Sequence, residues 1–270
     1  MAITKTTPNL PPSVNYKAFY HWAPNDLLAE TSKYTSDQDV ITYKEGEADE
    51  KCRVFGREHD AYVSVLPCEK GEPVCAEDRA NLARGPFFFM SSTIFKRLKL
   101  RLPLTGFEHA LLTEVNVAYA QLHPNSWAFV RAFSILCNHL DHTPSVDVFL
   151  YFFEAKNPGK RLWLSFNGVA GRVLLTLFQQ SYKSFKKKFF KVSCSVHDPT
   201  LLDGFPLYWV EKPGLKKPRS LEDLTPPDRE MCQLFSGLEA VFDTVKLIKL
   251  EFCAKTLKSY IGTVLISASH

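Results

Sequence analysis

The sequence predicts an α+β fold, with a helical half at about residues 90–155, a small antiparallel sheet at about residues 160–210 and a C-terminal helix. Two observations lead to this prediction. Apolar residues recur at helical spacing through the first half, and the period becomes strand-like after the breaker Asn157-Pro158-Gly159. Helices followed by strands are typical of an α+β domain, whereas a doubly wound fold would alternate them.

The helical half is predicted to begin with two well-marked helices. Thr105 and Glu108 have the spacing of a capping box, in which each side chain binds the other residue's backbone amide, so one helix starts there. A second helix follows Asn125, a good N-cap residue. Its apolar stripe includes Trp127 and its opposite stripe includes Arg131, which predicts an amphipathic helix at the domain surface.

A third helix is predicted to begin at Thr143-Pro144, because proline is favoured in the first helical turn. Residues 146–153 are apolar nearly all round, so this helix should be buried. A final helical pattern covers about residues 228–257, after a linker rich in lysine and proline.

The predicted sheet follows the third helix. Residues 161–166 and 172–178 are expected to pair as a hairpin around the turn signal Asn167-Gly168. Two more strands are predicted at residues 189–192 and 205–210, where aromatic and β-branched side chains are concentrated.

Three regions are expected along the chain. Residues 1–85 are predicted to be a poorly ordered acidic lead-in, because they show no regular period beyond a strand-like run at 61–66. Residues 86–212 form the central domain, and residues 213–270 hold the linker and the C-terminal helical segment.

The charge distribution points to the central domain. The 270 residues are 45% hydrophobic and 23% charged, which excludes wholesale disorder, collagen and coiled coil. The net charge of +4 divides into −4 over residues 1–85, +9 over residues 86–191 and −1 over residues 192–270. A positively charged middle third predicts a polyanion or an acidic surface as a partner.

Seven cysteines, an odd number without a repeated spacing, favour a reduced intracellular compartment, nuclear or cytoplasmic. No signal peptide is recognised, and no apolar run approaches the roughly 20 residues that cross a bilayer, so no membrane partner is predicted. The sequence sets no oligomeric state.

A short run carries a family resemblance. Gln121, Leu122, His123, Pro124, Asn125, Ser126 and Trp127 resemble a motif of the plant gypsy-type transposon family, also described as a gypsy-type transposase domain. The similarity extends over about residues 86–212. Two positions depart from the family pattern, since Tyr119 replaces a proline and Phe185 replaces a tryptophan.

The resemblance implies a transposable-element-derived plant protein, from the gag-side part of a retrotransposon reading frame. It implies no catalytic residue, because the family has no defined activity. Within the motif, Asn125 is explained by capping, and the run is expected to be mostly structural.

Enzymatic chemistry has little support in the sequence. A metal-dependent strand-transfer site needs converging carboxylates, and the family-like segment offers only Glu108, Glu114, Asp141, Asp147 and Glu154. We expect these to be helix-terminal or solvated. No catalytic residue and no cofactor is predicted.

Other constellations are equally weak. The cluster Cys137, His139 and His142 has Cys137 on the apolar stripe, so a structural role is preferred to a metal site, and no metal is predicted. The pair Cys194 and His197 has no residue to orient the histidine. Asp243-Thr244 is followed by valine, where a retroviral-type aspartic protease would need glycine.

The strongest positive signal is a basic run with interleaved aromatic residues. Its candidate nucleic-acid-binding residues are Lys183, Lys186, Lys187, Lys188 and Lys191. If the run is a helix, its aromatic side chains face the core and the lysines form a solvated face. If it is a strand, lysines share a face with phenylalanines, as on nucleic-acid platforms. Arg97, Lys99 and Arg101 are candidates to extend the patch.

These features favour a non-enzymatic, transposable-element-derived protein that binds nucleic acid weakly and without sequence preference, or assembles with other element-encoded proteins. One alternative is a protein-interaction module without nucleic-acid binding, which uses the outer face of the helix at 126–140. A divergent metal-dependent transposase or nuclease ranks last.

Overall fold

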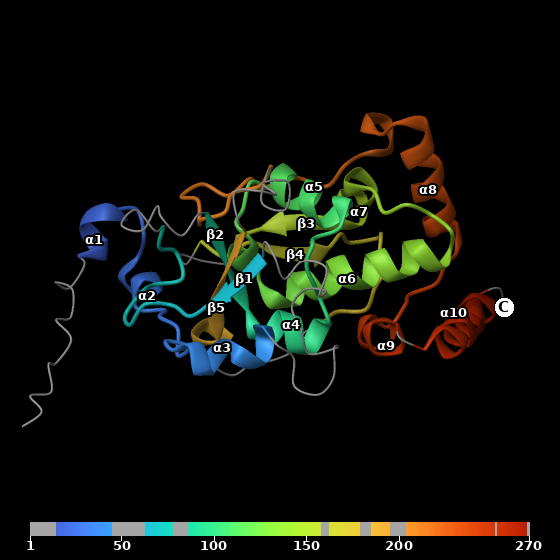
Figure 1. The fold of residues 1–270 in the computed structure, drawn as a ribbon. Coiled ribbons are helices and arrows are strands. Elements are labelled where there is room, and N and C mark those ends of the chain that lie inside the picture. Colours follow the sequence, from blue (N-terminus) through green and yellow to red (C-terminus); the bar gives the residue numbers. More distant parts are fainter. Residues whose placement is uncertain are drawn as a thin grey trace, which may run out of the picture.

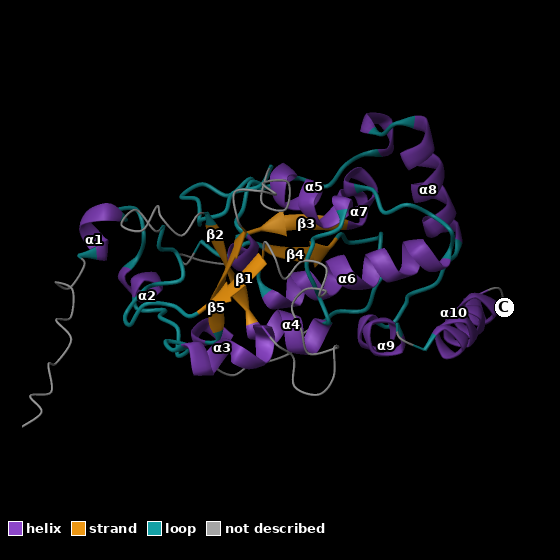
Figure 2. Cartoon of the chain, viewed as in Figure 1, coloured by secondary structure: helices purple, strands orange, loops and turns teal. Residues whose placement is uncertain are grey.

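The computed structural model describes residues 15–44, 63–77, 86–157, 162–178, 185–194, 204–251 and 253–268. Within these ranges the chain forms α-helices around two small antiparallel sheets, and the last helix, α10, lies at the C-terminal end (Figures 1 and 2). The predicted α+β class with a C-terminal helix is therefore confirmed. The positions of several strands differ from the prediction.

The larger sheet joins segments that are far apart in the sequence. Its strand order is β1 (Val63–Leu66), β5 (Phe189–Cys194) and β2 (Phe87–Ser91), with both pairings antiparallel. Val192 lies opposite Val65 on one side and Phe88 on the other. The strand at 189–192 is thus confirmed, and it is the central strand of a sheet that begins well before residue 160.

This sheet separates two hydrophobic cores, which explains the uninterrupted apolar composition of β2. Phe88 and Met90 face the main core, whereas Phe87 and Phe89 face a second core formed with Leu27 and Val74. Successive side chains of a strand point to opposite faces, so a strand buried on both faces needs apolar residues at every position.

The main core surrounds α6 (Pro124–His139), which Figure 1 shows running through the centre of the molecule. The predicted amphipathic surface helix is wrong, because the side chains from Ser126 to Val130 are all buried and Ser134 is only 5% exposed. The polar residues that suggested an outer face satisfy backbone groups. Ser134 donates to the Val130 carbonyl at 3.0 Å, and the Phe166 amide donates to the Ser126 hydroxyl at 2.7 Å.

Two helices precede α6 on this core. Helix α4 (Ser92–Leu98) follows β2 directly, and α5 (Gly106–Glu114) begins with the predicted capping box. The Thr105 amide donates to Glu108 Oε2 at 2.8 Å, and the Glu108 amide donates to Thr105 Oγ1 at 3.3 Å. A 3₁₀ turn at Tyr119–Gln121 then leads into α6.

The smaller sheet replaces the predicted hairpin. Helix α7 (Val146–Phe152) follows the N-cap Ser145, so the predicted start at Thr143-Pro144 is wrong, whereas its burial is confirmed from Val148 onwards. It passes directly into β3 (Phe153–Lys156), which pairs with β4 (Ser165–Gly168). Gly168 lies opposite Phe153 at the end of this pairing, and the turn that follows uses Gly171, with φ of +77°. Within 172–178 the only β-contact described is a single bridge from Leu175 to Phe242.

The predicted strand at 205–210 is absent from the structure. These residues form turns, in which the side chains of Phe205 and Trp209 are buried. Their backbone is not paired in a strand. The Val210 amide and carbonyl both bind the side chain of Gln121. The aromatic side chains that suggested a strand instead attach this turn segment to the hydrophobic cores.

Much of the expected lead-in is ordered. Residues 15–44 form α1 (Tyr16–Phe19), α2 (Asn25–Leu28) and α3 (Asp37–Lys44), and 63–77 supply β1 and the loop behind it. Helices α1 and α2 belong to the part that covers the second core, while Val40 and Tyr43 of α3 reach the main core. The prediction of a poorly ordered lead-in therefore does not hold for these residues.

The described residues of the C-terminal region form three α-helices, where one was predicted. They are α8 (Pro226–Gly237), α9 (Thr244–Leu250) and α10 (Ala254–Ala268), preceded by a 3₁₀ turn at Leu221–Asp223. Glu239 has a φ of +48° after α8, and Phe242 pairs with Leu175, so the backbone leaves the helical path between α8 and α9. Among the described residues, no helix is long and apolar enough to cross a membrane.

The linker after residue 212 is fixed by one close backbone approach, which yields a stability prediction. The Gly214 amide donates to the Val115 carbonyl at 2.7 Å, and a Cβ at Gly214 would lie 2.8 Å from that oxygen. We expect Gly214→Ala to lower the free energy of unfolding by about 1–3 kcal/mol, measured by urea denaturation.

Gly262→Ala is the matched control for this change. A Cβ at Gly262 meets nothing within 4 Å, and the residue lies inside α10. The added methyl group should raise the stability by about 0.5–1 kcal/mol, since alanine favours helix more than glycine. A Gly214→Ala protein as stable as the wild type would show that the linker does not need this contact.

Candidate nucleic-acid interface

The structure resolves the basic run into a turn and a strand. Phe185–Lys187 form a 3₁₀ turn, and β5 begins at Phe189. Phe189 is buried and Phe185 is half-buried, so these rings pack against the protein and offer no open stacking platform. Lys183 lies outside the described residues.

Lys191 does not belong to any surface patch. It is 5% exposed and forms an ion pair with Glu72, with 2.8 Å between Nζ and Oε1. Its Nζ also lies 4.6 Å from the centre of the Phe87 ring. Because an ammonium group in a buried ion pair cannot reach a phosphate, we exclude Lys191 from the candidate interface.

Lys186 is also engaged within the protein. Its Nζ lies 2.7 Å from Glu30 Oε1 and 5.5 Å from the centre of the Trp163 ring. The side chain is 28% exposed, which leaves it at the edge of the surface with most of its charge balanced by Glu30. The carboxylates that neutralise Lys186 and Lys191 both come from the N-terminal part of the chain.

Backbone hydrogen bonds to other segments fix the positions of the two remaining lysines, Lys187 and Lys188. The Lys187 carbonyl accepts a hydrogen bond from the Lys33 amide at 2.9 Å, and the Lys188 carbonyl accepts one from the Ser92 amide at 2.8 Å. Lys187 is exposed and Lys188 is half-buried. The two bonds place this pair between Lys33 and the first residue of α4.

A pair of tyrosines brings two further cations to the same place. The hydroxyl groups of Tyr34 and Tyr43 lie 3.2 Å apart, and Tyr34 also bonds Ser92 at 3.1 Å. Lys33 Nζ lies 5.1 Å from the centre of the Tyr34 ring, and Lys96 Nζ lies 4.9 Å from that of Tyr43. Attraction between each ammonium and the ring face helps to fix both lysines.

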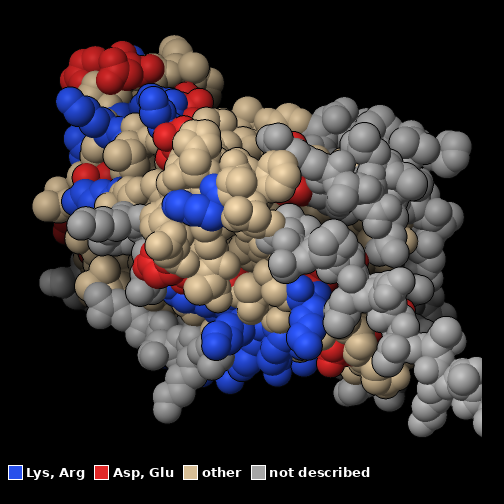
Figure 3. Space-filling view, turned by 90° about the vertical axis from the view of Figure 1, so that its left-hand side faces the viewer, with Lys and Arg blue, Asp and Glu red and all other residues tan. Residues whose placement is uncertain are grey.

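Helix α4 contributes the rest of the cations. Its exposed face carries Lys96 and Arg97, and Lys99 is exposed at the C-cap in the left-handed conformation, with φ of +58°. We define the basic surface as Lys33, Lys96, Arg97, Lys99, Lys187 and Lys188. Figure 3 shows Lys and Arg side chains gathered along the lower part of the face that contains α3 and α4.

Two carboxylates lie close to this surface. Asp39 of α3 accepts hydrogen bonds from Ser36 and from the Thr35 amide, which lower its pKa, and nearby Lys33 adds to the effect. Asp37 is exposed in the same first turn. These two carboxylates on α3 therefore reduce the positive charge at this edge of the basic surface.

Sequence reasoning found four of the six residues of this surface. Lys187, Lys188, Arg97 and Lys99 were candidates, but Lys33 and Lys96 were not. Lys33 was not a candidate because residues 1–85 were predicted to be poorly ordered. Lys96 could have been found from its position next to Arg97 on a predicted helix.

Four side chains of the run Gln121–Trp127 have hydrogen-bond partners within the protein, and Asn125 Oδ1 is buried without one among the described residues. The Gln121 side chain is fully buried and donates to the carbonyls of Leu162 and Val210 at 3.1 and 2.8 Å. Trp127 Nε1 donates to the Tyr119 carbonyl at 3.2 Å, and the two rings lie 4.5 Å apart. These contacts join the start of α6 to segments near residues 162 and 210.

His123, and not Asn125, is the N-cap of α6. Its Nδ1 accepts a hydrogen bond from the Asn125 amide at 3.1 Å, and its ring contacts those of Phe185 and Trp163. Burial lowers the pKa of His123 to about 4, and the nearby charge of Lys186 adds to this. The histidine is therefore neutral at physiological pH.

The candidate catalytic carboxylates do not converge. Glu108 accepts a hydrogen bond from the Thr105 amide in the capping box. Glu114 and Asp147 each form an ion pair with Arg219, at 2.8 Å. Glu154 pairs with Lys156 on β3. Over the described part of the chain, no group of three His, Cys, Asp or Glu residues is placed to hold a metal ion.

The remaining candidate clusters are also explained by packing. Burial raises the pKa of the Cys137 thiol, and His142 contacts the ring of Phe235. Asp243 caps α9 by accepting the Lys246 amide at 2.9 Å. His197 and the side chain of Cys194 lie outside what the structure describes.

Comparison with known proteins adds one finding. Residues 90–157 match the family model described as "Putative gypsy type transposon". No curated protein and no solved structure matches the chain. The gypsy-type match confirms the predicted family over these residues, a shorter span than the expected 86–212.

The gypsy-type segment corresponds to a definite part of the fold. It runs from Met90 in β2 through α4, α5, α6 and α7, and ends after β3. It contains the Gln121–Trp127 motif together with Lys96 and Arg97, whereas Lys33, Lys187 and Lys188 lie outside it. The basic surface thus combines gypsy-type and flanking residues.

His123 gives a pH prediction. Its pKa is about 4 in the folded protein against 6.5 in the unfolded chain, so the neutral form stabilises the fold. This contribution is complete above pH 6.5 and is lost as the pH falls towards 4, up to about 3 kcal/mol. His123→Asn keeps a capping oxygen and should show a smaller loss of stability between these pH values, measured by urea denaturation. The same pH dependence in both proteins would contradict this role.

Lys191 gives a stability prediction. Lys191→Met leaves Glu72 buried without its cation, so we expect a loss of about 3 kcal/mol in the free energy of unfolding. Adding Glu72→Gln should recover part of this loss. The exposed control, Lys187→Met, should change stability by less than about 0.5 kcal/mol. Equal effects at Lys187 and Lys191 would contradict the buried ion pair.

Proposed function

We propose that this chain is a transposable-element-derived plant protein that binds nucleic acid weakly and without sequence preference through the basic surface. The observation that supports this most is that three distant segments bring Lys33, Lys96 and the pair Lys187-Lys188 together around two tyrosines, with Arg97 and Lys99 on the same helix as Lys96. Most of them are exposed, so phosphate groups can approach without unfolding any element.

The chemistry of the surface favours phosphate contacts and not base recognition. Five of its six residues are lysines, which act as point charges, and Arg97 alone offers a planar fork. Tyr34 and Tyr43 use their hydroxyl groups within the protein, and Phe189 is buried. Phosphate contacts fix a protein on a nucleic acid but carry no sequence information, so binding should be non-specific.

We propose a non-enzymatic role for the same protein. Glu114 and Asp147 share Arg219, and Glu108 serves the start of α5. A strand-transfer site would need such carboxylates to converge on metal ions. The interaction surface considered at residues 126–140 is not favoured either, since most of its side chains are buried in the main core.

The basic surface predicts a definite salt dependence. With a labelled single-stranded oligonucleotide, fluorescence anisotropy should show an affinity that falls steeply as salt rises. Lys187→Ala with Lys188→Ala removes up to two phosphate contacts, so the slope of log K against log salt should become shallower by about 1.4.

A matched variant keeps the net charge equal. Lys255→Ala with Lys258→Ala removes two exposed lysines from α10, outside the basic surface, and should leave affinity and slope nearly unchanged. Lys187→Arg with Lys188→Arg should retain binding. Equal losses in the two alanine pairs would mean that net charge alone drives binding and would reject the surface.

A further inference from the structure

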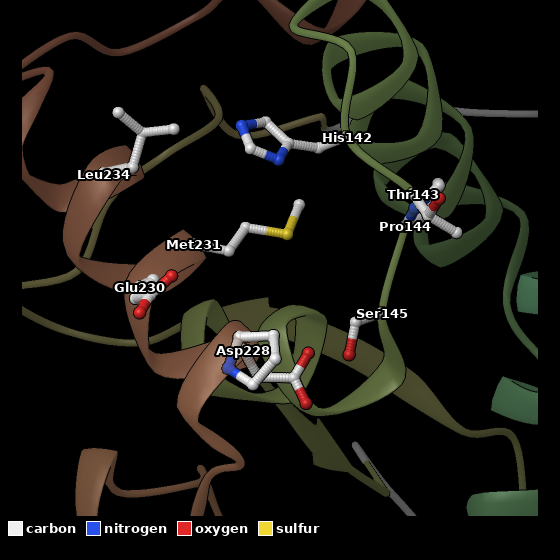
Figure 4. Close-up of a pocket in the computed structure, with 9 residues that line it drawn as sticks. His142, Thr143, Pro144, Ser145, Asp228, Glu230, Met231 and Leu234 are labelled. Carbon is white, nitrogen blue, oxygen red and sulfur yellow. The ribbon is translucent and has the colours of Figure 1, made fainter.

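A second surface feature lies on α8, away from the basic surface. It is a groove of about 620 Å³ between α8 and the loop that joins α6 to α7. Figure 4 shows Met231 from α8 and His142 from the loop projecting into the space between the two walls. A volume of several hundred Å³ is within the range of sites that hold small ligands or a few side chains.

The floor of the groove is apolar. Met231 is buried and anchors α8 to the main core, whereas Leu234, one turn further, is 45% exposed and belongs to neither core. Pro144 and Pro227 also line it. An apolar side chain entering from a partner would therefore remove Leu234 from water.

The polar lining has one sign of charge. Asp228 and Glu230 of α8 line the groove, and no lysine or arginine does. Asp228 is held by the Thr225 hydroxyl at 2.7 Å, so its carboxylate is fixed at the wall, while Glu230 is exposed. A cationic group would find two carboxylates here without displacing an internal ion pair.

Two hydroxyl groups, of Thr143 and Ser145, line the groove. Ser145 is the N-cap residue of α7, yet its side chain makes no capping hydrogen bond. Figure 4 places it on the loop wall across from α8. A hydroxyl can both donate and accept, so it can bind the backbone of an extended segment.

We propose that this groove binds a short basic segment of a partner protein, in which Lys or Arg side chains flank a bulky apolar residue. The apolar residue contacts Met231 and Leu234, and the cations face Asp228 and Glu230. The groove complements such a segment in shape and in charge, because its apolar floor and its acidic side chains occur together in a space of the right size. The site is independent of the basic surface and of nucleic-acid binding.

A labelled model peptide tests the proposal. The probe is Lys-Leu-Lys-Lys-Leu-Lys, compared by fluorescence anisotropy with its charge-reversed counterpart Glu-Leu-Glu-Glu-Leu-Glu. The basic peptide should bind the full chain and the acidic one should not. Leu234→Ser should weaken binding about fivefold, and Glu230→Gln about threefold at low salt.

Two control variants change the same residue types elsewhere. Leu177 is 70% exposed and Glu239 is exposed beyond the end of α8, and neither lines the groove. Leu177→Ser and Glu239→Gln should bind the peptide like the wild type, and circular dichroism should show that all four variants are folded. Equal binding of the two peptides, or equal losses in test and control variants, would overturn the proposal. So would light scattering that shows a dimer lost in Leu234→Ser, because the groove would then hold a second copy of this chain.

Discussion

The ion pair between Lys191 and Glu72 is the contact on which the arrangement of the chain depends. Lys191 lies in the central strand β5, opposite Leu66 and Phe89, and points to the face that the N-terminal segments cover. Glu72 also accepts the Glu69 amide at 2.7 Å, so its carboxylate has two partners. A charge in this position is costly unless it is paired, so the loop that carries Glu72 must cover the sheet.

The need to pair buried charges also decides which cations remain exposed at the surface. The acidic N-terminal region and the basic middle of the chain meet, and Glu30 and Glu72 neutralise Lys186 and Lys191. Lys187 and Lys188 stay free of carboxylate contacts among the described ion pairs, and the hydrogen bond to Lys33 adds a cation from the supposedly acidic region. The net charge of each segment therefore indicates which segments attract each other. Which charges stay exposed depends on the ion pairs that form in the folded chain.

Some local signals in the sequence predicted the structure correctly, whereas the sequence carries no signal for pairing between distant segments. The capping box at Thr105, the strand at 189–192 and the burial of 148–153 depend on neighbouring residues, and all three are confirmed. The pairing of β5 with β1 and β2, and of β4 with β3, depends on segments far apart in the chain. The depth of α6 was missed because serine hydroxyls that bind backbone groups resemble a solvent-facing stripe in sequence.

Both candidate surfaces lie where the gypsy-type segment meets its flanks. In the basic surface, Lys96 and Arg97 belong to residues 90–157, whereas Lys187 and Lys188 do not. In the groove, His142 and Ser145 belong to the matched segment, and the α8 wall comes from outside it. The matched segment supplies the buried scaffold, and each surface is completed by residues that the family model does not cover. A change in the flanks can therefore alter either surface while the scaffold stays the same.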